Sequence, residues 1–83
     1  MIGITTERVE MIIVDGNLGE TFKTYHLEVR RLMPNGHPYM GRVRFASSDD
    51  INKLKDFGIR LGVTLWQEQN DVCDIWIGTL NLP

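Results

Sequence analysis

The chain carries one cysteine and two histidines, the side chains that most often serve as nucleophile and general base. To react as a thiolate, Cys73 would need a neighbouring base and a positively charged setting, and only the fold could bring His26 or His37 close to it. These residues are far apart in sequence and match no zinc-ligand spacing. We therefore expect Cys73 to pack in a strand and predict no catalytic residue, no metal site and no cofactor.

Carboxylates and glycines form two further patterns. Asp49, Asp50 and Asp56 lack the regularly spaced oxygens and closing glutamate of a calcium loop, and the first two suit the start of a helix. Gly16 and Gly19 follow an expected strand, but the segment lacks the lysine of a P-loop and the third glycine of a dinucleotide site. Neither pattern predicts a ligand.

Arginines form the polar cluster with the clearest chemical use. Arg30, Arg42 and Arg44 are expected on one face of a sheet, where guanidinium groups could contact phosphates or an acidic protein. That face lacks the exposed aromatics of RNA-binding sheets, and a net charge of −2 gives no overall attraction to nucleic acid. Three interpretations stay open: a solvated face with cross-strand pairs to Glu28, contact with an acidic protein, and weak nucleic-acid binding.

Length and composition predict a small globular unit. The 83 residues correspond to a single domain, 1–83, of marginal stability. One cysteine allows no intrachain disulfide, so good packing or a partner must supply stability. With 42% hydrophobic and 24% charged residues the chain is not of a disordered type. No signal peptide or bilayer-length apolar run is visible, so a cytoplasmic location without membrane contact is expected.

Apolar alternation predicts strands over residues 6–14, 21–32, 39–46 and 72–79. Residues 34–38 form a turn, because two prolines flank an Asn-Gly pair. Val29 and Val43 should share a face, since a one-residue slip would place valine beside arginine, and this parity requires a three- or five-residue loop. Tyr39, Val43 and Phe45 would then point inward. The tail 80–83 is expected along the surface.

A helix is predicted from residue 51 to about residue 69, preceded by Ser47 and Asp50 in the spacing of a capping box. An alternative breaks this helix near Gly58 and restarts it at Ile59. Gly58 and Gly62, four residues apart, would also permit close approach of another backbone.

This predicted helix has more apolar surface than one small sheet covers. A first stripe would pack on the sheet, and Ile59, Val63 and Trp66 form a second stripe well round the helix. We predict that the second stripe contacts a protein partner, with a second copy of the chain as one candidate. Tryptophan is frequent among interface hot spots, so core and interface stay equally open for Trp66.

The segment Val-Arg-Arg-Leu-Met-Pro-Asn-Gly at 29–36, the strand at 39–45, Trp-Ile-Gly at 76–78 and the final Leu-Pro resemble parts of small uncharacterised bacterial domains. In those domains a proline-glycine hairpin precedes one helix and a short tryptophan-containing strand. The sequence departs from that pattern at 58–60, where an acidic residue would start the helix. The resemblance implies a fold and no activity.

The elements follow the order strand, strand, strand, helix, strand, which is typical of the α+β class. We expect an antiparallel three- to four-stranded sheet packed on one helix. The expected function is that of a small non-enzymatic protein–protein interaction module, self-associating or antagonising a partner protein, by analogy with small bacterial and phage proteins. The alternatives are a small enzyme with its site at a dimer cleft and a weak nucleic-acid binder using the arginine face.

Overall fold

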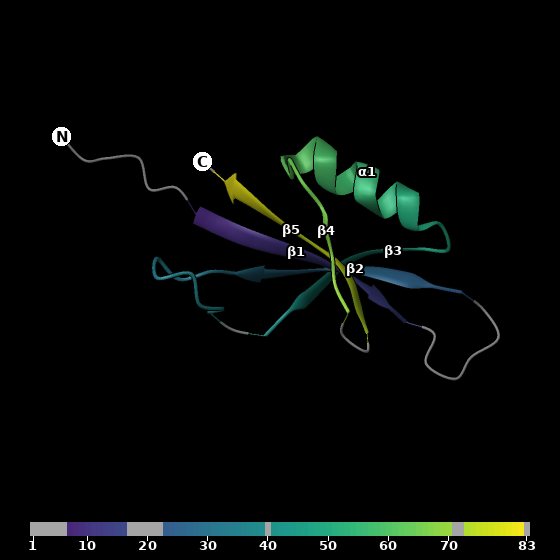
Figure 1. The fold of residues 1–83 in the computed structure, drawn as a ribbon, viewed down its shortest axis with the longest axis horizontal. Coiled ribbons are helices and arrows are strands. Elements are labelled where there is room, and N and C mark those ends of the chain that lie inside the picture. The colour runs from purple at the N-terminus through teal and green to yellow at the C-terminus, as the bar shows by residue number, and fades with distance from the viewer. Residues whose placement is uncertain (1–6, 17–22, 40, 71–72, 83) are drawn as a thin grey trace.

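The computed structural model describes residues 7–16, 23–39, 41–70 and 73–82. They form one antiparallel sheet with a helix, α1, lying over one face (Figure 1). The elements are β1 (Glu7–Asp15), β2 (Tyr25–Arg31), β3 (Val43–Ser48), α1 (Ile51–Leu61), β4 (Gln67–Glu68) and β5 (Asp74–Leu82). The predicted α+β class and antiparallel pairing are confirmed. The two-residue strand β4, which was not predicted, makes the sheet five-stranded.

Strand β1 lies at the centre of the sheet, whose strand order is β3-β2-β1-β5-β4. Its residues 11–14 are Met-Ile-Ile-Val, and all four are buried. An apolar run without alternation is typical of a strand covered on both faces. The side chains of Val9, Met11 and Ile13 join the core beneath α1, so Ile12 faces the other side of the sheet, where it is also fully buried.

The β2–β3 hairpin has the predicted register. Val29 pairs with Val43, and the isolated bridge between Leu32 and Pro38 leaves a five-residue loop, 33–37. Within that loop Gly36 has a φ of 86° and its N–H donates to the carbonyl of Met33 at 2.8 Å. A five-residue loop was one of the two lengths that the valine parity allowed.

The predicted bounds of several strands were wrong. The tail was expected on the surface, but Leu80 is a buried residue of β5. Strand β3 begins at Val43 rather than at residue 39. The predictions made for residues 6, 17–19, 21–22 and 72 concern positions outside the described part of the chain.

Asp50, rather than Ser47, caps the helix. Its carboxylate accepts a hydrogen bond from the N–H of Asn52 at 2.9 Å, and Ser48 Oγ accepts one from the N–H of Asp50 at 3.0 Å. A short acceptor side chain at this position satisfies an N–H group that the helix leaves without a partner. The Ser47 capping box was therefore wrong.

Helix α1 ends at Leu61, eight residues before the predicted end at Gln69. Gly62 terminates it with a φ of 129°, and its N–H donates to the carbonyls of Gly58 and Ile59, each at 3.1 Å. The helix is continuous through Gly58, so the alternative with a break there was wrong too. Five turns were expected, and the glycine limits the helix to about three.

The segment after α1 inserts Trp66 between helix and sheet. A Cβ atom on Gly58 would lie 2.3 Å from Trp66 Cζ2, and one on Gly78 of β5 would lie 3.2 Å from Trp66 Cε3. The indole N–H donates to the carbonyl of Lys55 at 3.1 Å. Because both glycines lack side chains, the indole ring fits between the two backbones. A close approach of another backbone was predicted at Gly58, and the structure places the indole ring of Trp66 there instead.

The predicted second helical stripe does not exist. Val63 and Trp66 lie beyond the end of α1 and are 2% and 8% exposed. The folded chain therefore does not present them to a partner. Of the three residues, only Ile59 lies on the helix, and it is exposed.

Gly58→Ala should destabilise the chain, although alanine favours a helix by roughly 1 kcal/mol. The added methyl group would overlap the indole of Trp66, and overpacking of this kind costs about 1–3 kcal/mol. Urea unfolding of wild type, Gly58→Ala and Gly41→Ala measures the difference. Gly41 is a matched control, because a Cβ there meets nothing within 4 Å.

The same substitution made in a Trp66→Leu background tests the cause. With the indole removed, Gly58→Ala should lose its cost or become stabilising. An equal cost in both backgrounds would show that the indole contact is not responsible.

Candidate protein-interaction surface

The sheet face opposite α1 carries a network of ion pairs. Glu10 and Arg30 are opposite each other in the β1–β2 register, and Arg30 NH2 lies 2.6 Å from Glu10 Oε1. Arg42, just before β3, donates both terminal nitrogens to Asp74 of β5, each at 2.8 Å. Its guanidinium also lies 3.7 Å from Glu28 of β2.

Arg42 crosses the central strand. Its partners Glu28 and Asp74 belong to β2 and β5, the two strands that flank β1. Glu28 is opposite Ile12 in the register, and Asp74 is opposite Val14. The arginine side chain therefore passes over this part of β1, which accounts for two buried apolar residues on the face without a helix.

The bidentate contact perturbs both partners. Hydrogen bonding to Arg42 holds the pKa of Asp74 below its ordinary value, against the opposing effect of burial. The same hydrogen bond raises the pKa of Arg42. The carboxylate is thereby kept ionised well into the acid range.

The predicted gathering of arginines on one face is confirmed, together with the pairing of Glu28. Arg30 and Arg42 are each bound to carboxylates, and three acidic groups, Glu10, Glu28 and Asp74, lie among the three arginines. Arg44 is exposed and makes no ion pair with the described residues. Arg30 and Arg42 are thus already paired with carboxylates, which reduces the positive charge that this face offers to nucleic acid.

Cys73 and His26 flank the same end of β1, where Val14 pairs with His26 of β2 and with Asp74 of β5, while His37 lies at the other end. Cys73 is half-buried beside the end of β1, where its carbonyl accepts from the N–H of Asp15 at 2.9 Å. His37 lies in the turn near the beginning of β1, and His26 Nδ1 lies 2.7 Å from Ser47 Oγ on the β3 side. Among the described residues no three His, Cys, Asp or Glu side chains gather to hold a metal ion. The described part of the chain contains no helix long and apolar enough to cross a membrane.

Large apolar side chains are exposed beside β3. Tyr39 is 59% exposed, Val43 68%, Phe45 55% and Phe57 of α1 38%. The rings of Phe45 and Phe57 lie 5.6 Å apart and link the strand to the helix. We call these four residues the β3 surface.

The expectation that Tyr39, Val43 and Phe45 point into the core was wrong. Strand β3 is at one end of the strand order, and an 11-residue helix is only about 16 Å long. The sheet beneath it is about 19 Å across and its longest strands are about 30 Å long. Helix α1 does pack against β3, and Phe57 contacts Phe45, but it covers only part of the strand and leaves Tyr39, Val43 and Phe45 more than half exposed. Alternation shows which residues share a face but not which part of that face is covered.

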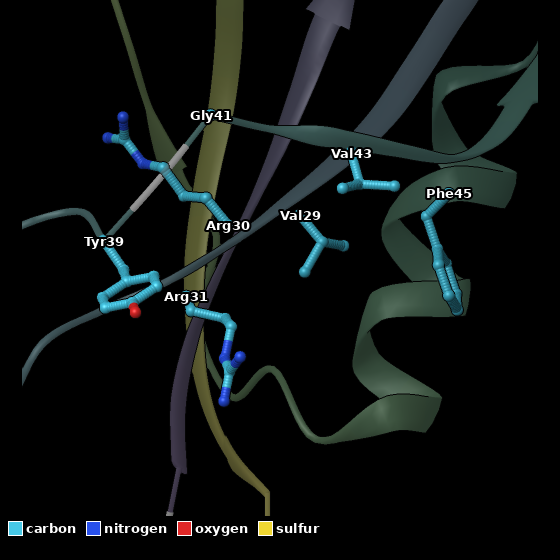
Figure 2. A pocket seen from close by; sticks show the side chains of 7 residues that line it. All are labelled: Val29, Arg30, Arg31, Tyr39, Gly41, Val43 and Phe45. Carbon is cyan, nitrogen blue, oxygen red and sulfur yellow. The ribbon is translucent and has the colours of Figure 1, made fainter.

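An open hollow of about 370 Å³ lies on this surface (Figure 2). Val29 and Val43 face one another in it, while Tyr39 and Phe45 stand at its two ends. Arg30 and Arg31 extend from β2 in opposite directions. The lining residues include these two arginines and no carboxylate.

The pairing of β2 explains the hollow. The N–H of Tyr39 donates to the carbonyl of Arg31 at 2.9 Å, and Val43 pairs with Val29. Between these two contacts β2 advances by two residues, from 31 to 29, whereas the paired chain advances by four residues, from 39 to 43. The pairing between β2 and the chain that follows it is therefore irregular at Arg30.

Arg31 is positioned at the rim of the hollow. It lies over the ring of Tyr39, with 5.8 Å from the guanidinium carbon to the ring centroid, and forms an ion pair with Glu7. Both members of that pair are substantially exposed, so the pair is weak. Arg31 can therefore exchange Glu7 for another carboxylate at little cost.

Comparison with protein-family models, with curated proteins and with solved structures found no match. The β3 surface is therefore the main basis for assigning a function to the chain.

Asp74 should make stability depend on pH. Because its pKa is lowered in the folded chain, the stabilisation is present above the unfolded pKa and is lost as the pH falls through the folded one. Asp74→Asn should cost about 1–3 kcal/mol at neutral pH, the range for hydrogen bonds to charged groups. It should also flatten the loss of stability from about pH 5 downwards.

Urea unfolding between neutral and acid pH measures both effects. Asp56→Asn is the control, because Asp56 is exposed and forms no ion pair with a described residue. If Asp74→Asn kept the acid slope of the wild type, the Arg42 contact would not be what stabilises the sheet.

Proposed function

We propose that the chain is a non-enzymatic protein–protein interaction module that binds a partner protein through the β3 surface. The observation that carries this proposal is the clustering of four large, exposed apolar side chains, three of them aromatic, beside a strand at the sheet edge. Exposed apolar clusters rimmed by polar groups are common at protein interfaces, and aromatic residues are enriched there. Binding at such a site would allow the chain to antagonise its partner.

The structure offers less support for the two alternative functions. Two of the arginines on this face are paired with carboxylates, which weakens the case for nucleic acid. Cys73 and His26 flank the same end of β1, but the His26 ring is hydrogen-bonded to Ser47 and His37 lies at the other end, so an enzyme at a dimer cleft would need a second copy to complete its site. The cytoplasm is the proposed location, since the chain's single thiol suits a reducing compartment.

Self-association is a second candidate, and the exposed side chains of Ile59 and Leu65 favour it. They are 54% and 65% exposed. Ile59 is thus the residue of the predicted partner stripe that a second copy could contact. This apolar pair is a smaller target than the β3 surface.

Photo-crosslinking tests the main proposal. A photoreactive phenylalanine analogue placed at Val43 should crosslink to a discrete partner protein in cells that express the chain. The same analogue at Lys53, an exposed position on α1, is the control. A partner band from position 43 and none from position 53 is the expected result. Equal, diffuse labelling from both positions would contradict a specific β3 surface.

Light scattering over a range of concentrations tests self-association. If Ile59 is at a self-interface, the wild type should show a dimer mass that decreases in Ile59→Asp, because burying an unpaired charge at an interface is costly. A constant monomer mass for both proteins would exclude the homodimer and leave the β3 surface to a different protein.

A further inference from the structure

The hydrogen-bonding edge of β3 is open. Among the described residues β3 pairs only with β2, so its other side has no neighbouring strand. An edge strand of this kind can accept an added strand, whose main chain supplies affinity and whose alternate side chains supply specificity. The β3 surface thus has the backbone partner groups as well as the apolar contacts that an extended segment needs.

Side-chain directions along β3 specify what such a segment must carry. Val43 and Phe45 line the hollow, and Arg44 between them belongs to the opposite face, where it pairs in register with Glu28. The register shifts between Leu27 and Glu28, so Phe45 itself has no partner on β2. Residues directly opposite one another on adjacent strands lie on the same face. An added strand would therefore place apolar side chains beside Val43 and Phe45 and a polar one beside Arg44.

Charge indicates the sign of that polar residue. Arg44 makes no ion pair with the described residues, whereas Arg30 and Arg31, which line the hollow, are paired with Glu10 and Glu7. Opposite charges across a strand pair are favourable and like charges are unfavourable. The partner residue facing Arg44 should be aspartate or glutamate, and a second carboxylate could reach Arg31.

The same charges argue against a second copy at this edge. In a two-fold contact each surface meets itself, so arginines around one hollow would face the arginines of the other. Strand β3 itself carries Arg44 and, among its described residues, no carboxylate that could form an ion pair with Arg44 of a second copy. A different chain with the opposite charge is the better fit.

We propose that the β3 edge binds an extended segment of another protein in which apolar and acidic residues alternate. Apolar side chains enter the hollow, and a carboxylate pairs with Arg44 on the other face. This inference depends on the proposed function and names the partner chemistry of the same surface.

Peptides of about seven residues, a usual strand length, provide the test. One alternates valine and glutamate, a second has lysine for every glutamate, and a third has proline for the central valine, which removes a donor and resists a strand. Fluorescence anisotropy measures the affinity of each for the wild-type chain and for Arg44→Glu. Arg44 is exposed, so this variant should fold, and circular dichroism checks that it does.

The glutamate peptide should bind the wild type roughly tenfold more tightly than the lysine peptide. The order should reverse in Arg44→Glu, and the proline peptide should bind neither protein. Binding by neither charged peptide, equal binding by both, or binding by the proline peptide would overturn the inference. A specific crosslink from position 43 without charge preference among the peptides would leave the proposed function intact and remove this inference alone.

Discussion

The contact of Trp66 with Gly58 and Gly78 determines how the helix sits on the sheet. The indole fills the space between α1 and β5 because neither glycine has a side chain to occupy it. Its N–H group is satisfied by the carbonyl of Lys55, so the buried ring leaves no polar atom without a partner. Val63, from the same segment, packs against Gly78. A domain of this size has few such contacts, and each therefore contributes a large share of its stability.

The opposite face of the sheet is held by charge instead of by a second layer. Arg42 joins Glu28 to Asp74 across β1 and shields the apolar residues of that strand. A long guanidinium side chain suits this position, because its stem covers apolar atoms while its planar end donates hydrogen bonds to one carboxylate and lies beside a second. The arginines suggested nucleic-acid binding as one interpretation, and their partners explain them as structural groups. Arg44 differs from them, because it forms no ion pair with the described residues.

The β3 surface stays exposed although α1 packs against β3. Gly62 ends α1 after 11 residues, and the next residues turn back to place Val63 and Trp66 in the core. In a helix of the predicted length, Val63 and Trp66 would have lain on the second stripe instead of in the core. The chain does expose large apolar side chains, as predicted, but they lie on β3 and at Phe57 rather than on a second stripe of the helix. A partner protein is therefore still proposed, but its contacts are with the β3 surface instead of with Val63 and Trp66.

The sequence alone determined the α+β class, the antiparallel hairpin with Val29 opposite Val43, and the arginine face, because strand alternation and turn residues act over short distances. The tertiary structure decided where α1 ends, since Gly62 could be read as an interior glycine or as a terminator until Trp66 was placed. It also decided that Leu80 is buried and that Tyr39, Val43 and Phe45 are exposed. Those properties depend on which strand lies at an edge and how far one helix reaches. No local pattern encodes the position of a strand in a sheet, because that position is set by contacts between residues distant in sequence.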